Sequence, residues 1–424
     1  MSVPARTGFN VKIWILEIGE PLPIEPNARL HRYGVFSKWL AEHGHDVTWW
    51  TSSFSHTPKK NFVEEDCEVI KDGVRLKFIF GKGYPRNISF SRIKHQAEFA
   101  SKFLVQAEAY LAGGGTKPDV IMAPIPTVDG AAAAVKFGFR HSIPVIADIR
   151  DLWPDEIRDL APTFARLIVQ VALSGAYKKL RAVCVGASAI CGVSKSYLEY
   201  GLKYADRKQS TDFVFPLGYS VQKLSPEKLE ASEKWFQTLK IPQAAFVSCF
   251  FGTIGQFFDL STVIRSAREL GENYYFILGG DGSSLEDFRK EALGLKNVIF
   301  TGWLDAAQIQ TVMKHSHAGL APYAKHAKMS LPNKPFEYMS AGLPVVSSIQ
   351  YELKDILATN KAGVTYVADS GAGFNGALKI LKNDLIRAEY GKNARDLFER
   401  EFDSEKVFAT AIENIRKVVE QAHA

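Results

Sequence analysis

One segment combines a lysine, a glutamate and helix-boundary residues at a spacing that suits a phosphorylated ligand. It runs from Ser330 to Val346 and reads Ser-Leu-Pro-Asn-Lys-Pro-Phe-Glu-Tyr-Met-Ser-Ala-Gly-Leu-Pro-Val-Val. Its first two prolines are typical of a helix entrance, and its glycine and last proline of a helix end. The segment therefore predicts a short helix with Lys334 in its first turn and Glu337 about one turn further in.

Such a helix start is suited to a nucleotide-like group. Its N-terminus and Lys334 can bind a diphosphate, and Glu337 can accept hydrogen bonds from both hydroxyls of a ribose. The alternative is a structural ion pair between Glu337 and a neighbouring lysine. The other residues expected to contact a ligand here are Ser330, Leu331 and Asn333.

Two glycine-containing loops follow predicted strands in the same half of the chain. Gly252-Thr-Ile-Gly255 and Ile277-Leu-Gly-Gly-Asp-Gly282 both lie between a strand and a helix. Glycines there let backbone amides approach a phosphate. Taken alone, each loop is also consistent with a tight turn that only begins the next helix. The predicted contacts are Gly252, Thr253, Gly255, Gly280 and Asp281.

Charged residues also follow predicted strands in the first half. Asp148-Ile-Arg-Asp-Leu-Trp-Pro-Asp-Glu156 places four acids and an arginine around a Trp-Pro pair, which is unusual for a plain loop. Arg29, His31 and Arg32 begin a predicted helix. They could face an anionic ligand or form a solvated basic face.

The elements that must position these residues alternate between short apolar strands and amphipathic helices. This order predicts two doubly wound Rossmann-like α/β domains with parallel sheets, whose ligands bind at the carboxyl ends of the strands. We expect a first domain over 1–220, a hinge over 221–243, a second domain over 244–400 and a terminal helix over 401–424 that crosses back to the first domain. The predicted strands are Val11–Leu16, Asp46–Thr51, Asp119–Ala123, Pro144–Ile149, Asp212–Pro216, Phe246–Phe251, Tyr274–Leu278, Val298–Thr301, Ala318–Pro322, Val345–Ser348 and Gly363–Val367.

Composition narrows the class of protein. The 424 residues are 46% hydrophobic and 23% charged, which is typical of globular domains and excludes a disordered chain. A net charge of +6 does not indicate nucleic-acid binding. The four cysteines have no zinc-like or disulfide-like spacing, which favours a reducing, cytoplasmic location. The longest apolar runs are too short to span a bilayer.

Taken in order, the motifs of the second half resemble the nucleotide-sugar domain of GT-B glycosyltransferases, most closely the retaining family called family 4. The resemblance covers Phe251–Gly255, Phe276–Gly282, Val298–Trp303 and Phe336–Val346. It implies that Glu337 binds the ribose, as the second glutamate of a Glu-x7-Glu motif. It also implies that the backbone at Gly302, Trp303 and Leu304 contacts the base.

Two positions depart from the family pattern. Met329 stands where the first glutamate of the motif would fall, and Thr253 stands where many members have an arginine that binds the diphosphate. A branch with a Gly-Thr-Ile-Gly loop and a Pro-x-Lys-x-x-Glu segment is similar, which suggests that Lys334 has taken over the phosphate contact.

The first half resembles the acceptor domain of the same enzymes. The loop Glu17-Ile-Gly-Glu-Pro-Leu-Pro is similar to one that contacts donor and acceptor, so that Gly19 and Glu20 are predicted contacts. Arg150-Asp151 falls where many relatives have His-Asp. We therefore expect Asp151 near the anomeric centre and Arg150 at a phosphate, with Lys334 as the third catalytic candidate.

The resemblance implies transfer of a hexosyl group from a UDP-sugar to a glycan or lipid-linked acceptor, with retention and without a metal ion or other cofactor. No Asp-x-Asp motif of the metal-dependent GT-A kind occurs. The alternatives are a nucleotide-sugar epimerase of the same architecture and a catalytically silent binding partner. An apolar stretch from Phe164 with a basic end at Lys178–Arg181 could dock on the anionic inner face of the cell membrane, or could be a core helix with a solvated end.

Overall fold

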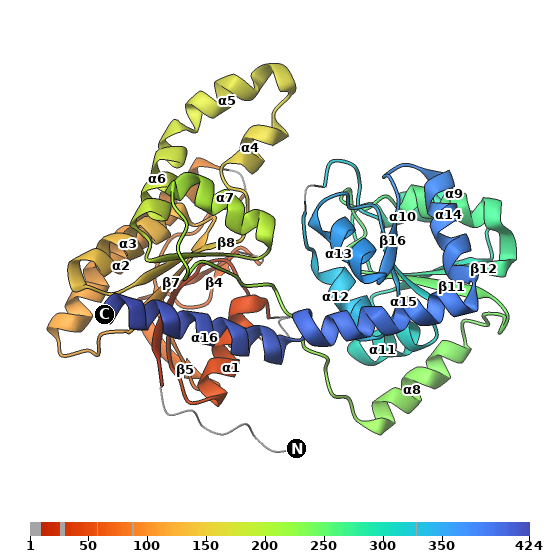
Figure 1. The fold of residues 1–424 in the computed structure, drawn as a ribbon, viewed down its shortest axis with the longest axis horizontal. Helices are drawn as coiled ribbons and strands as arrows, with labels where there is room; N and C mark the ends of the chain where they lie inside the picture. Colours follow the sequence, from red (N-terminus) through yellow and green to blue (C-terminus); the bar gives the residue numbers. More distant parts are fainter. Residues whose placement is uncertain (1–9, 26–29, 57, 87–88, 328) are drawn as a thin grey trace. The chain divides into compact units, whose positions relative to one another are not determined.

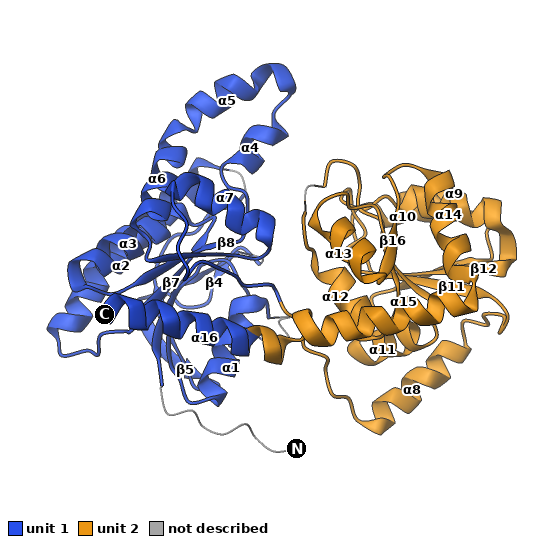
Figure 2. Cartoon of the chain, in the orientation of Figure 1, with its two compact units in different colours: residues 1–217, 408–424 blue, residues 218–407 orange. Residues whose placement is uncertain are grey.

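The computed structural model describes residues 10–25, 30–56, 58–86, 89–327 and 329–424. The chain divides into two compact units (Figure 2). Unit 1 consists of residues 1–217 and 408–424, and unit 2 consists of residues 218–407. No helix in the described part of the chain is both long and apolar enough to cross a membrane.

Unit 1 is built on an eight-stranded sheet in the order β10-β9-β8-β7-β1-β2-β6-β5 (Figure 1). Its neighbours are parallel except for β5, which pairs antiparallel with β6. The strands are β1 Lys12–Leu16, β2 Asp46–Ser52, β5 Cys67–Lys71, β6 Val74–Ile79, β7 Val120–Ile125, β8 Val145–Ile149, β9 Ala189–Gly192 and β10 Phe213–Val214, beside the small hairpin β3 Phe54–Ser55 and β4 Lys60–Asn61.

Helices pack on both faces of this sheet, as parallel strands require. One core joins α2, α3, α6 and α7 to the sheet, and α1 lies against β2 and β6. The helices of unit 1 are α1 Arg32–Glu42, α2 Phe90–Ala112, α3 Val128–His141, α4 Asp155–Leu160, η1 Thr163–Ala165, α5 Arg166–Ala172, α6 Ser174–Gly186 and α7 Lys195–Ala205.

The terminal helix α16, Ser404–His423, returns to unit 1, which confirms the predicted crossover. The Phe408 ring lies 5.1 Å from the ring of Phe36 and 6.4 Å from that of Phe215. The chain therefore passes between the units twice, at 217–218 and at 407–408.

Unit 2 has a six-stranded, wholly parallel sheet in the order β13-β12-β11-β14-β15-β16. This order changes direction between β11 and β14, which is where open α/β sheets bind ligands. The strands are β11 Phe246–Phe251, β12 Tyr274–Gly279, β13 Val298–Gly302, β14 Ala318–Ala321, β15 Val345–Ser347 and β16 Gly363–Thr365.

The helices of unit 2 alternate with these strands. Helices α9, α10 and α14 share one apolar core with the sheet, and α12 packs on β14 and β15. They are α8 Pro226–Gln237, α9 Leu260–Leu270, η2 Gly271–Asn273, α10 Leu285–Glu291, α11 Ala306–Lys314, α12 Asn333–Ser340, α13 Glu352–Asn360, α14 Gly371–Lys382, α15 Asp384–Leu397 and the π-helical turn η3 Phe398–Phe402.

The two Rossmann-like sheets confirm the predicted fold class. The segment expected to be a hinge, 221–243, contains helix α8 and belongs to unit 2, where Glu233 binds Lys314 and His315 of α11 at 2.6 and 2.7 Å. Strands β5, β6 and β9 were not predicted.

Candidate active site

The glycine loops of unit 2 join one another through their backbones. Gly252 donates its N–H to Gly279 O at 3.0 Å, and Gly280 donates its N–H to Gly302 O at 2.7 Å. A Cβ on Gly280, whose φ is +137°, would overlap the Gly252 carbonyl. Only glycine therefore fits at position 280, and the ends of β11, β12 and β13 form one continuous loop edge.

Lys334 extends from the first turn of α12 to this edge. Its ammonium nitrogen occupies the space that a Cβ on Gly252 would need, and it lies 4.9 and 4.7 Å from the ring centres of Phe250 and Phe258. The two aromatic faces favour a cation at this point. Two residues predicted from separate motifs are thus neighbours.

Helix α12 begins at Asn333, which confirms that Lys334 lies in its first turn. The N-cap residue, Pro332, makes no side-chain cap, and the amide groups of a first helical turn are suited to an external anion. Asn333 is exposed, whereas Ser330 and Leu331 are buried.

Glu337 lies one turn further along α12 and is 6% exposed. One carboxylate oxygen accepts a hydrogen bond from the hydroxyl of Tyr219 at 3.2 Å. Tyr219 was not predicted, because nothing in the sequence links it to a residue 118 positions away. The hydrogen bond orients the Glu337 carboxylate at this buried position.

The remaining predicted residues of unit 2 differ in how far their side chains are exposed to a ligand. Trp303 is 73% exposed, whereas the side chain of Leu304 is buried, so that only its backbone can face a ligand. Thr253 and Asp281 are exposed, and Asp281 accepts the Gly282 N–H at 2.7 Å. Met329 stands where the family that this chain resembles has a glutamate, and the methionine is 36% exposed.

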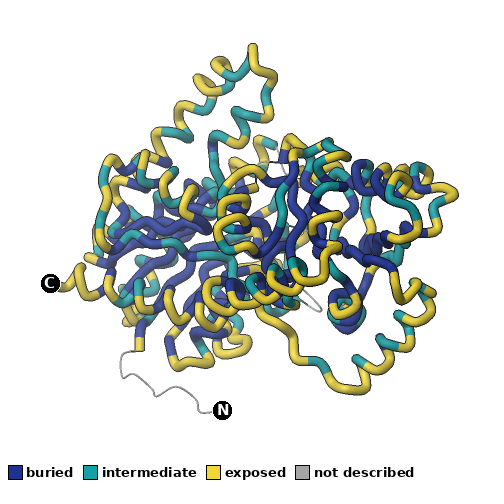
Figure 3. The backbone as a smooth tube through the Cα atoms, turned by 45° about the vertical axis from the view of Figure 1, so that its right-hand side comes forward, coloured by how far each residue is buried: buried dark blue, intermediate teal, exposed yellow. Residues whose placement is uncertain are grey.

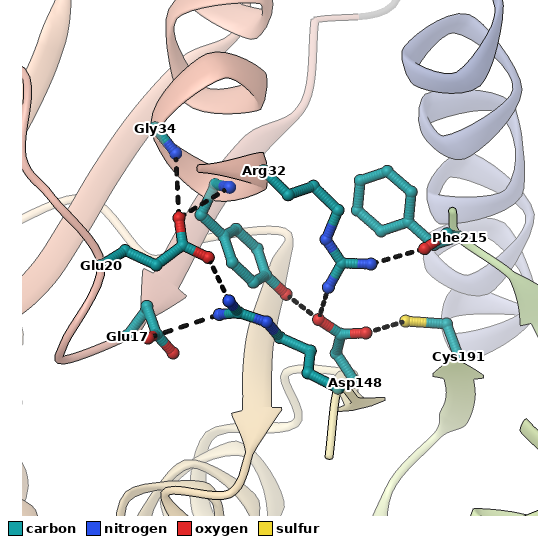
Figure 4. A network of polar contacts seen from close by, with 9 residues as sticks. Glu17, Glu20, Arg32, Gly34, Asp148, Cys191 and Phe215 are labelled. Atoms are coloured by element: carbon teal, nitrogen blue, oxygen red, sulfur yellow. Dashed lines mark hydrogen bonds and ion pairs between the residues drawn. The ribbon is translucent and has the colours of Figure 1, made fainter. Parts of the chain in front are cut away.

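In unit 1, a buried network of charges follows strands β1 and β8 (Figure 4). Arg150 lies between Glu17 and Glu20, with N–O distances of 3.3 and 2.5 Å. Glu20 in turn accepts hydrogen bonds from the backbone N–H groups of Tyr33 and Gly34, at 3.0 and 3.4 Å. Both residues lie in the first turn of helix α1. The guanidinium thus fixes the loop after β1 to the end of β8. Its predicted contact with a phosphate stays a prediction.

Asp148 is the second centre of this network. It binds Arg32, accepts the Tyr33 hydroxyl at 2.7 Å and the Cys191 thiol at 3.3 Å, and has no exposed surface. Arg32 also donates to Phe215 O at 2.5 Å and its side chain is fully buried. Arg32 is therefore neither on a solvated basic face nor open to a ligand, and both interpretations of it were wrong. Arg29 lies outside the described residues.

A cavity of about 150 Å³ lies beside this network at the carboxyl edge of the sheet. It brings together four predicted site residues, Gly19, Glu20, Arg150 and Asp151, with His31, which was expected to face a ligand or solvent. The rest of its lining is Glu17, Ile18, Phe54, His56, Tyr84, Arg92, His95, Gln96, Pro126 and Thr127. Sequence reasoning missed His56, Tyr84 and His95, because they come from irregular segments and from α2.

The cavity wall is less charged than its residue types imply. Burial raises the pKa of Glu17 to about 8, against the lowering effect of Arg150 and with further raising by Glu20 and Asp148. Burial also raises the pKa of Asp151, and lowers that of His56 to about 4. Glu17 Oε2 has no hydrogen-bond partner among the described residues. A neutral Glu17 at pH 7 can therefore donate or accept a hydrogen bond toward a ligand.

Part of unit 2 is similar to a recognised family of proteins. Residues 246–383 match the family described as glycosyl transferases group 1. Over 244 residues the chain is 20% identical to an uncharacterized glycosyltransferase of Methanocaldococcus jannaschii, covering 55% of this chain and 59% of that protein. It is 25% identical over 209 residues to a Bacillus subtilis protein named as a teichuronic acid biosynthesis glycosyltransferase, covering 48% and 50% of the two chains. The matches thus span about half the length of these relatives.

The whole chain resembles solved structures in fold. Anabaena HepE in complex with UDP has a TM-score of 0.66 and 16% identity, covering 96% of this chain and 100% of that one. The covered part of the chain therefore includes residues of both units. The chain has the GT-B fold, and its residues 246–383 match the group 1 glycosyl transferases.

Proposed function

We propose that this chain transfers a hexosyl group, N-acetylhexosaminyl groups included, from a UDP-sugar to a glycan or lipid-linked acceptor. In this proposal the anomeric configuration is retained, no metal ion is needed, and the product is a cell-surface polysaccharide or glycoconjugate. The observation that carries the proposal is the contact of Lys334 with the Gly252 loop, one helical turn from the buried Glu337. Further support comes from HepE, whose structures contain UDP, UDP with glucose, and UDP-glucose.

The donor is assigned to the loop edge of unit 2. The first-turn amides of α12 and the Lys334 ammonium would bind the diphosphate and stabilise the negative charge that develops as UDP leaves. Glu337, oriented by Tyr219, would accept hydrogen bonds from the ribose hydroxyls. The exposed indole of Trp303 is suited to stack on the base.

The acceptor is assigned to the cavity of unit 1. A neutral Glu17 with an unpartnered oxygen is suited to a sugar hydroxyl, which both donates and accepts hydrogen bonds. Asp151 is the proposed polar group near the anomeric carbon. Arg150 is a positioning residue in this scheme, because its contacts with the carboxyl groups of Glu17 and Glu20 fix the loop that carries Gly19.

The direct test is turnover of UDP-sugars with and without candidate acceptors, together with protection of the chain from thermal unfolding by UDP. We expect UDP to raise the melting temperature and one UDP-sugar to be consumed faster when its acceptor is present. If no nucleoside diphosphate protects the chain, the proposal is wrong.

Met329 favours one other function. A methionine cannot bind a sugar hydroxyl as the family glutamate does, so the chain could bind a nucleotide-sugar without turning it over. Protection by UDP-sugars with no hydrolysis or transfer of any of them would identify such a silent binding partner. Interconversion of two UDP-sugars without an acceptor would instead identify an epimerase.

A further inference from the structure

A segment of unit 1 projects from the rest of the unit (Figures 1 and 3). It consists of α4, η1, α5 and the first turns of α6. The residues of α4, η1 and α5 are all described, and none of them is buried. Only the later part of α6 enters the core, through Leu180, Val183 and Cys184. The core-helix interpretation is therefore wrong for η1 and α5 and is confirmed only for the later part of α6.

The projecting segment exposes five large apolar side chains, which we call the apolar tip. They are Leu160, Phe164, Leu167, Ile168 and Val171, and their exposed fractions are 69, 87, 72, 72 and 67%. The last four recur at intervals of three and four residues, which is the spacing of one helix face. Scattered exposed apolar residues are common, but a contiguous group marks an interaction surface.

The charges within and after the apolar tip have one sign. From Leu160 to Leu198 the sequence has no aspartate or glutamate, but it has Arg166, Lys178, Lys179, Arg181 and Lys195. Lys178 and Arg181 are exposed on α6. Lys179 is paired with Asp129 at 2.5 Å. An apolar tip beside cations is complementary to a layer that has an apolar interior and anionic groups at its surface.

The carboxylates of α4 do not change this balance at the tip. Asp155 and Asp159 each pair with Arg158 at 2.9 Å, and Asp155 also accepts the Tyr177 hydroxyl. Glu156 is exposed on α4. The acids thus lie before the tip in α4, and the cations lie within and after it.

We propose that the apolar tip inserts into the headgroup region of an anionic lipid bilayer, with Lys178 and Arg181 at the lipid phosphates. An amphipathic surface binds such an interface through buried apolar area and through attraction to anionic lipid. A second copy of the chain would bring the same cations together, and like charges oppose that contact. The proposal does not rest on the proposed enzymatic activity.

The experiment is sedimentation of the full chain with vesicles of phosphatidylglycerol and phosphatidylcholine, compared with pure phosphatidylcholine. We expect binding to the anionic vesicles. The variant Phe164→Ser/Leu167→Gln/Ile168→Gln should weaken it about tenfold or more, because it removes most of the inserted apolar surface. Lys178→Glu/Arg181→Glu should remove the preference for anionic lipid.

The matched control is Phe139→Ser/Leu293→Gln/Leu385→Gln, which changes three side chains that are 89, 84 and 84% exposed elsewhere on the chain. It should bind vesicles as the unchanged chain does, and all variants should keep the same circular dichroism spectrum. Failure of the unchanged chain to bind anionic vesicles would overturn the proposal, as would equal binding by the tip variant. A dimer in solution that only the tip variant dissociates would assign the surface to a second copy instead.

Discussion

The ammonium group of Lys334 occupies the space beside Gly252 that the Cβ atom of any other residue would need. The two residues are separated by more than eighty positions in the sequence, and they meet at the point where the sheet order of unit 2 changes direction. The contact joins the helix start of α12 to the glycine loops. It has measurable consequences for stability and for binding.

Replacement of Gly252 by alanine should destabilise unit 2. The φ of Gly252 is +138°, which alanine rarely adopts, and the new methyl group would displace Lys334. We expect a loss of about 1–3 kcal/mol in the free energy of unfolding, measured by denaturant titration. In the Lys334→Ala background the loss should be smaller, because the overlap is removed.

The control for this prediction is Gly376→Ala in α14, since a Cβ there has no described atom within 4 Å. This change should be neutral or should stabilise the chain by about 0.4–1 kcal/mol. Equal effects at positions 252 and 376 would contradict the account of the loop.

Replacement of Glu337 by glutamine should reduce discrimination between UDP and its 2′-deoxy analogue. The charged acceptor is lost, although the amide oxygen can still accept from Tyr219. We expect the variant to bind UDP about tenfold more weakly. Its affinity for the deoxy analogue should fall less, because that analogue makes one hydrogen bond fewer to residue 337. Calorimetric titration measures both affinities. Glu389→Gln, which changes an exposed partner of Lys361, is the control.

Glu17 should make the folded chain less stable as the pH rises. Its pKa of about 8 when folded lies above the value near 4.5 that it has when unfolded. Between these two values the unfolded chain binds fewer protons, so the free energy of unfolding falls with increasing pH. Glu17→Gln removes this contribution. The difference in stability between variant and unchanged chain should therefore grow in favour of the variant from pH 5 to about pH 8. A constant difference would be inconsistent with a protonated Glu17.

The pair of Arg32 and Asp148 should be a large stability determinant of unit 1. Asp148→Asn leaves a fully buried guanidinium without its counter-ion, at a cost of about 3–5 kcal/mol. Glu230→Gln breaks an exposed pair with Lys234 and should cost about 0–1 kcal/mol. Thermal unfolding of both variants measures the contrast. Similar melting temperatures would show that the network does not stabilise the unit.

The regular elements were predictable because their hydrophobic patterns are local. Strand β11 has the predicted bounds, and α12 begins so that Lys334 lies in its first turn. Strand β9 was missed because it has only four residues, two of them small. The side-chain pairing was not predictable: Arg32 binds a residue 116 positions away, so no local pattern distinguishes its buried pair from a solvated arginine.

The central claim is that Lys334 and the start of α12 bind a diphosphate, and Lys334→Met tests it most directly. Methionine retains the apolar stem beside Phe250 and Phe258 but removes the charge. Calorimetric titration should give about tenfold to hundredfold weaker binding of UDP, and a clearly smaller loss for UMP, since a charge-assisted hydrogen bond contributes about 1.5–3 kcal/mol. Lys354→Met, on the exposed surface of α13, should leave both affinities unchanged. Unchanged affinity of the Lys334→Met variant for UDP would contradict the account.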